Sequence, residues 1–279
     1  MKYLIESALA GKTMDILSRL KYPQDFFGST QVHHLVKFGD SFSGLIGKSE
    51  AELPKDEVIV LEHNFSEAKK LMDKINGLAQ QIIANNKKYD DLGLCREYFQ
   101  LAKIGYRMLD KFKPQGIPVS LERAGLVVTR LALGLDQEAI IDNEQRVVTK
   151  RTHLIDEPDE NLSVTIKWRD EVKLKELNGQ EILLADFVNP ASGASGAALV
   201  VALQAKGLRV AKVNHRSISC TRQGVNFIRE EFLKFGVKTS FVSVGECSEL
   251  NERYYLTGDR AVADAGQVLR HFLPKWYKE

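Results

Sequence analysis

Residues 182–197 of this 279-residue chain read ILLADFVNPASGASGA, and this stretch decides the fold. Its apolar beginning predicts a buried strand that ends at Asp186, and the small residues 191–196 predict the start of a helix. The first N–H groups of a helix have no partner within the helix, and the helix dipole favours negative charge there. With the hydroxyls of Ser192 and Ser195, the stretch favours an anion site; a tight turn that binds nothing is the alternative.

Strands and helices alternate from Gly116 onward. This alternation predicts an α/β fold, with a largely parallel sheet covered by helices on both faces. In such sheets ligands bind beyond the carboxyl ends of the strands, where the strand order reverses, so we expect the chemistry in those loops. Strands are predicted at 117–121, 145–152, 162–168, 181–185, 208–213, 216–220 and 237–244, and helices at 125–133, 197–206 and 223–235; an acidic turn, 156–160, joins two of the strands.

The first part of the chain has a mixed pattern. Residues 6–20 predict a helix, turn-rich sequence follows, and the β-branched run 57–61 predicts a strand. Apolar residues at three- and four-residue spacing then predict two helices, over 66–82 and 94–108, each with one face in the core.

Composition excludes several classes of protein. Lys plus Arg total 39 and Asp plus Glu total 37, so the net charge of +2 gives no reason to expect a nucleic-acid partner. Apolar runs are far shorter than the roughly 20 residues that span a bilayer, and the N-terminus does not resemble a signal peptide. The three unclustered cysteines are typical of reduced thiols, with Cys220 and Cys247 expected to be buried. We therefore expect a soluble cytoplasmic protein without a membrane partner.

The strand, the acid and the small-residue loop resemble the 5-phosphoribosyl-1-diphosphate (PRPP) motif of type I phosphoribosyltransferases. They look most like the uracil phosphoribosyltransferase version, which runs roughly D-P-M-L-A-T-G-G-S. Three more segments match family motifs in the same order: PVSLERAGL at 118–126, SCTRQG at 219–224 and LNERYYLTGDR at 250–260. REYFQLAKIG at 96–105 resembles the family's preceding helix. The resemblance implies a phosphoribosyltransferase-like domain over 65–279, after an N-terminal extension, 1–64, of unknown role.

The resemblance also implies roles for matched residues. Arg123 would pair with the pyrophosphate, and Arg151, on the predicted hairpin, would be a second PRPP-binding arginine. Asp186 would hold the ribose hydroxyls and Asp259 would lie near the reacting ribose, which makes them the candidate catalytic residues. The 5-phosphate would be bound by Ala191, Ser192, Gly193, Ala194 and Ser195, and the base by Tyr255, Leu256, Gly258 and Asp259.

The implied reaction transfers phosphoribosyl from PRPP to a uracil-like nucleobase and gives a nucleoside monophosphate and pyrophosphate. Positive charge develops on the ribose as pyrophosphate leaves, so positioned cations and backbone dipoles provide the stabilisation. Mg²⁺ is expected to travel with the pyrophosphate. The resemblance further implies a homodimer whose partners are PRPP and a nucleobase or nucleotide.

Three departures from the family pattern keep other functions open. Asn189 and Pro190 lengthen the loop after Asp186, Glu122 stands beside Arg123, and the segment before Arg260 is shorter than in the family. One alternative is a catalytically inactive regulator or sensor that binds PRPP or a nucleotide. Another is an α/β protein that binds a different phosphate-containing ligand.

Overall fold

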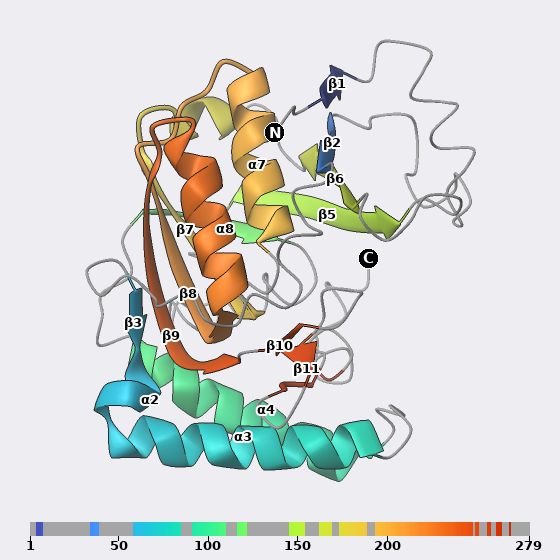
Figure 1. Ribbon diagram of the computed structural model, residues 1–279, viewed down its shortest axis with the longest axis vertical. Helices are drawn as coiled ribbons and strands as arrows, with labels where there is room; N and C mark the ends of the chain where they lie inside the picture. Colours follow the sequence, from blue (N-terminus) through green and yellow to red (C-terminus); the bar gives the residue numbers. More distant parts are fainter. Residues whose placement is uncertain are drawn as a thin grey trace.

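Figure 1 shows the computed structural model of the chain, which describes thirteen segments. These are residues 4–7, 34–38, 58–84, 91–109, 116–121, 145–153, 162–168, 173–188, 193–247, 249–250, 256–257, 261–263 and 268. Only the backbone is described for 4–7, 34–38, 145–153, 187–188, 249–250 and 256–257, and for 162, 163, 165 and 167. No helix in these segments is long and apolar enough to cross a membrane.

A nine-stranded sheet, in the order β1-β2-β6-β5-β4-β7-β8-β9-β3, organises the fold. The alternation of strands and helices therefore predicted the α/β class correctly. The parallel part consists of β5 (Gln145–His153), β4 (Ile117–Leu121), β7 (Glu181–Val188), β8 (Lys212–Thr221), β9 (Lys238–Cys247) and β3 (Val58–Val60). Antiparallel strands β6 (Leu162–Trp168), β2 (His34–Phe38) and β1 (Leu4–Ser7) continue it beyond β5.

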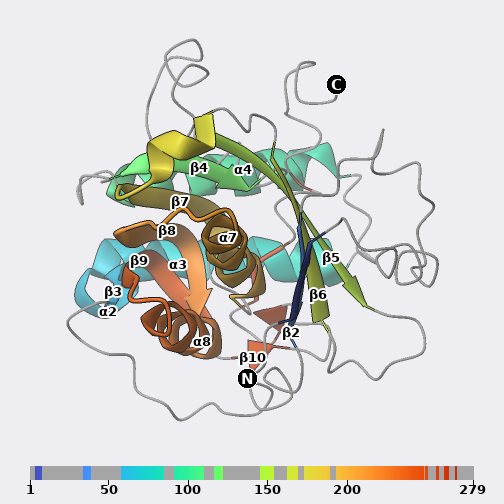
Figure 2. The ribbon, with the colours of Figure 1, turned by 90° about the horizontal axis from the view of Figure 1, so that it is seen from above.

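Helices α7 (Ala194–Ala205) and α8 (Arg222–Leu233) cover one face of the parallel strands. Almost all of α7 is buried, and its sequence is apolar on every side. Figure 2 gives the reason: seen from above, α7 lies between β7, β8 and β9 on one side and β5, β6 and β2 on the other. A helix enclosed in this way has no solvent-facing stripe, which explains the absence of helical periodicity in its sequence.

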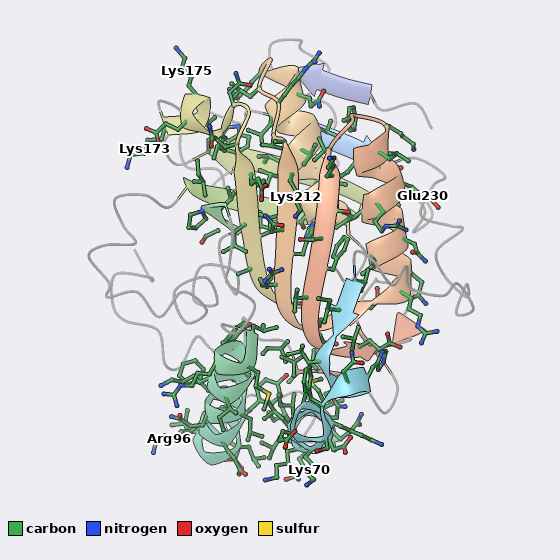
Figure 3. All side chains as sticks on the ribbon, turned by 90° about the vertical axis from the view of Figure 1, so that its left-hand side faces the viewer. Lys70, Arg96, Lys173, Lys175, Lys212 and Glu230 are labelled. Atoms are coloured by element: carbon green, nitrogen blue, oxygen red, sulfur yellow. The ribbon has the colours of Figure 1, made fainter. Side chains whose placement is uncertain are left out.

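Helices α3 (Ser66–Ala84) and α4 (Leu92–Leu109) pack against the opposite face. Both are amphipathic; Lys70 and Arg96, labelled in Figure 3, lie on their outer sides, away from the strands. Gly105 brings α4 close to the sheet, because a Cβ there would lie 2.5 Å from Cδ1 of Ile218. The Asp91 carboxylate caps α4 by accepting hydrogen bonds from the N–H groups of Gly93 and Leu94.

Most predicted elements in the described segments are confirmed, with shifted ends. Strand β4 and strand β6 have the predicted bounds, and β5 and β6 form an antiparallel hairpin. Residues 212 and 213 of the first predicted strand and the whole of the predicted strand 216–220 belong to one strand, β8, because its pairing with β9 is continuous through residues 214 and 215. The strand predicted from residue 208 is wrong over 208–211, which precede β8. The predicted helix 125–133 lies outside the described residues.

The described residues before residue 65 contribute three strands to the same sheet. The predicted helix over 6–20 is wrong at its beginning, because Glu6 and Ser7 belong to β1, which pairs with β2. Residues 8–20 lie outside the described segments. Strand β3 pairs in parallel with β9, and the short helix α2 (Leu61–Asn64) follows it. The extension of unknown role predicted over 1–64 thus includes an edge strand of the parallel sheet.

The core contains buried titratable groups whose pKa values are shifted by burial. The imidazole of His215 stacks on Phe241 with a centroid distance of 4.4 Å, and burial, with a contribution from Arg216, lowers its pKa to about 3. Cys220 and Cys247 are buried, as predicted, and neither forms a disulfide with another described cysteine. Burial raises the pKa of Cys220 to about 12, which suppresses the reactive thiolate.

Candidate functional site

The strand order of the sheet reverses between β4 and β7. From β4 the chain reaches β5 on one side, whereas β7, β8 and β9 follow one another on the other side. The β4–β7 ladder consists of the pairs Ile117–Ile182 and Pro118–Leu183. Beyond them β4 continues along β5 and β7 along β8, so the described parts of β4 and β7 are no longer paired. Ligands of open α/β sheets bind at such a reversal, beyond the carboxyl ends of the strands.

Asp186 lies on β7 beyond the last pair with β4. Alternate residues of a strand face opposite sides of the sheet. Leu184 packs in the core under α7 and α8, and Ala185 packs in the core under α3 and α4. The half-buried Asp186 therefore lies on the α7 side. The predicted end of the strand at Asp186 is wrong, because pairing with β8 extends β7 to Val188.

Helix α7 begins at Ala194, directly after Gly193 at φ +81°. The carbonyl oxygen of Gly193 accepts the hydrogen bond from the N–H of Ala197 at 3.0 Å, which marks the first turn. The helix therefore starts within the small-residue stretch 191–196, three residues before the predicted helix 197–206. The positive end of its dipole lies at the same edge of the sheet as Asp186, with Ala194 buried and Ser195 half-buried.

Packing of α7 against α8 explains both glycines in the stretch 182–197. A Cβ on Gly193 would lie 2.7 Å from Cγ1 of Ile228 and 3.0 Å from the carbonyl oxygen of Gly224. A Cβ on Gly196 would lie 3.3 Å from Cδ1 of Ile228. The two glycines of the stretch that predicts an anion site thus also allow the close contact between the two helices.

Helix α8 begins at the same edge, at the carboxyl end of β8. Thr221 caps it, since its Oγ1 accepts a hydrogen bond from the N–H of Gly224 at 2.9 Å. Ser219, two residues earlier on β8, is in register with Val188 at the end of β7. Its buried hydroxyl has no hydrogen-bond partner among the described residues. The ends of β7 and β8 thus bring two helix N-termini and a buried hydroxyl to one edge.

An ion pair fixes the start of α8 to the end of β9. The Glu246 carboxylate accepts hydrogen bonds from Nη2 and Nε of Arg222, at 2.7 and 3.1 Å. The N–H of Glu246 donates to Oε1 of Glu62 in α2 at 2.8 Å. Because Glu246 neutralises the guanidinium, Arg222 connects secondary-structure elements rather than offering an unbalanced cation to an anionic ligand.

Tyr106 of α4 is a contact at this site that the sequence did not predict. Its hydroxyl donates a hydrogen bond to the carbonyl oxygen of Asp186 at 3.3 Å, across 80 residues of sequence. Burial, together with the charge of Asp186, raises the pKa of Tyr106 well above its ordinary value, so the hydroxyl remains a donor. The apolar spacing that predicts this helix from the sequence does not include Tyr106.

The predicted site residues fall into three groups. Asp186, Gly193, Ala194 and Ser195 lie at the end of β7 and the start of α7. Arg151 lies on β5, beyond the residues of β5 that pair with β4. Leu256 lies on β11 (Leu256–Thr257), which pairs with β10 (Glu249–Leu250). Only the backbone of Arg151 and Leu256 is described. Those outside the described residues are Arg123, Ala191, Ser192, Tyr255, Gly258 and Asp259.

The structure is similar to several solved structures, whereas no protein-family model and no curated protein matches the sequence. A protein from Aquifex aeolicus is 17% identical, with a TM-score of 0.48 over 76% of this chain and 97% of that one. The orotate phosphoribosyltransferase of Mycobacterium tuberculosis in complex with PRPP is 12% identical, with a TM-score of 0.38 over 67% of this chain and 94% of that one. The adenine phosphoribosyltransferase of Thermoanaerobacter pseudethanolicus is 14% identical, with a TM-score of 0.34 over 55% of this chain and 85% of that one. All three TM-scores are below 0.5, and the chemistry of the site rests on the positions of its own residues.

Proposed function

We propose that the chain transfers a phosphoribosyl group from PRPP to a nucleobase. One observation carries this proposal: Asp186 lies past the last β4–β7 pair, at the reversal of strand order, and on the side of the sheet where α7 begins. A carboxylate can accept hydrogen bonds from two ribose hydroxyls, and a helix N-terminus favours a phosphate. A sugar phosphate matches this combination, since it carries both groups on one molecule.

In the proposed reaction, the bond from the anomeric carbon to pyrophosphate breaks, and the electron pair leaves with the pyrophosphate. A ring nitrogen of the base forms the new bond to that carbon and gives up its proton to water. Asp186 would orient the ribose, and the start of α7, with Gly193, Ala194 and Ser195, would hold the 5-phosphate. Mg²⁺ would arrive with PRPP as part of the substrate and balance the charge of the leaving group. The resemblance assigns contact with the pyrophosphate to Arg123 and a second PRPP contact to Arg151.

A uracil-like pyrimidine is the acceptor that the sequence resemblance favours. The segment assigned to it includes Tyr255, Leu256, Gly258 and Asp259. Strands β10 and β11 flank part of this segment and follow directly after β9. Backbone N–H and C=O groups beside this pair of strands would form hydrogen bonds with the edge of a planar base. We also propose a homodimer, which light scattering of the purified protein would test.

Titration calorimetry with PRPP, with and without Mg²⁺, tests the first step, and pyrophosphate release with a panel of bases tests the second. We expect Mg²⁺-dependent binding, and release with one pyrimidine. Asp186→Asn should weaken PRPP binding by about 10-fold or more, because hydrogen bonds to a charged group are lost. Asp91→Asn is the matched control, since Asn is an equally good cap for α4 and Asp91 lies at the helix end opposite Tyr106.

Each other result has a definite meaning. PRPP binding without release for any base would replace the enzyme with the alternative, a sensor that binds PRPP or a nucleotide. No PRPP binding by the wild-type protein would overturn the proposal. Equal weakening by Asp186→Asn and Asp91→Asn would remove Asp186 from the site.

A further inference from the structure

Two tyrosines of α4 each donate a hydrogen bond to a backbone carbonyl of a distant segment. Tyr106 donates to Asp186 at 3.3 Å, and Tyr98 donates to Ala263 at 3.4 Å. Both side chains are 1% exposed, and they lie two turns apart on the same buried stripe. The bonds are alike in kind, but only that of Tyr106 reaches the strand that carries the candidate catalytic acid.

The Tyr106 hydrogen bond reaches β7 beyond the residues that pair with β4. The β4–β7 ladder ends at the pair Pro118–Leu183, so β4 does not hold the backbone of β7 at Asp186 in the described structure. Strand β8 still pairs with β7 there, in register at Ser217. Helix α4 thus supplies a contact to β7 beyond the point where β4 separates from it.

Gly105 allows α4 to lie close enough to the sheet for Tyr106 to reach Asp186. With no Cβ at this position, α4 approaches β8 and β9 closely, since a Cβ would meet Ile218 at 2.5 Å and Val244 at 3.4 Å. The adjacent Tyr106 is then carried far enough into the core for its hydroxyl to reach the carbonyl of Asp186. The close approach of α4 to the sheet thus allows the hydrogen bond.

We propose that Tyr106 is a positioning residue for Asp186: its hydrogen bond fixes the peptide after Asp186 and thereby the direction of the carboxylate toward the ribose. This inference rests on the proposed function. A fixed carboxylate binds the ribose hydroxyls without first losing conformational freedom, so the bond should contribute to PRPP affinity. It should not affect recognition of the base, for which the sequence assigns a different segment.

Tyr106→Phe and Tyr98→Phe form a matched pair for testing this role. Each removes one buried hydroxyl from the same helix and leaves the ring in place. We expect Tyr106→Phe to raise the Kd and KM for PRPP by about 3- to 10-fold, in line with the loss of one hydrogen bond, with the KM for the base unchanged. Tyr98→Phe should change the melting temperature by a similar amount and leave the PRPP constants at their wild-type values.

Hydrogen exchange of residues 181–188, measured by mass spectrometry without ligand, provides a second readout. Tyr106→Phe should speed exchange at the end of β7, whereas Tyr98→Phe should not. If both variants behave alike in binding and in exchange, the positioning role is wrong. If the wild-type protein binds no PRPP, the proposed function fails, and faster exchange in Tyr106→Phe alone would still establish the link between α4 and Asp186. Unchanged exchange would overturn that link as well.

Discussion

Replacing Gly193 by alanine should show how strongly the contact between α7 and α8 constrains the start of α7. Gly193 has φ +81°, a conformation that costs an alanine about 1–2 kcal/mol. Its new Cβ would lie 2.7 Å from Cγ1 of Ile228 and 3.0 Å from Cδ1 of Phe227 and from the carbonyl oxygen of Gly224. Overpacking of this kind costs roughly 1–3 kcal/mol. We therefore expect Gly193→Ala to lower the free energy of unfolding by about 2–5 kcal/mol.

Gly207 offers a matched control at the other end of α7. It has φ +75°, but a Cβ at this position would meet nothing within 4 Å. Gly207→Ala should therefore show the conformational cost alone, about 1–2 kcal/mol. Urea denaturation of both variants measures the difference, which is expected to be about 1–3 kcal/mol. If Gly193→Ala is no more destabilising than Gly207→Ala, the helix contact does not require glycine there, and closeness to a ligand becomes the better explanation.

Three further predictions concern buried polar groups. Because His215 has a pKa of about 3 in the fold and 6.5 as its ordinary value, it is neutral when folded and protonates on unfolding. Stability is therefore lost as pH falls from 6.5 toward 3, by at most about 1.4 kcal/mol per pH unit, and His215→Gln should flatten a denaturation series over that range. Ser219→Ala should not lower stability, because its hydroxyl has no hydrogen-bond partner among the described residues; a loss above about 1 kcal/mol in urea denaturation would contradict this. At pH 8, iodoacetamide should leave all three buried cysteines unmodified until urea unfolds the protein, and mass spectrometry showing rapid labelling of Cys220 in the native state would oppose its raised pKa.

The sequence by itself determined the elements that depend on local pattern. The β-branched and apolar runs predicted β4 and β6 with their observed bounds, and the three- and four-residue spacing predicted α3 and α4. It also placed Asp186 and the small-residue stretch at the junction of a strand and a helix. These features follow from the periods of strands and helices, which are read over a few neighbouring residues.

Only the tertiary structure decided which strands pair and which residues meet at the site. Glu6 lies in a strand rather than a helix because β1 pairs with β2, and β2 in turn pairs with β6 from a distant part of the chain. The separation of β4 from β7 and the hydrogen bond from Tyr106 to Asp186 likewise join distant segments. Gly193 and Gly105 each have a neighbour that their own segments do not contain. Such contacts depend on the packing of whole elements, and no local pattern in the sequence encodes them.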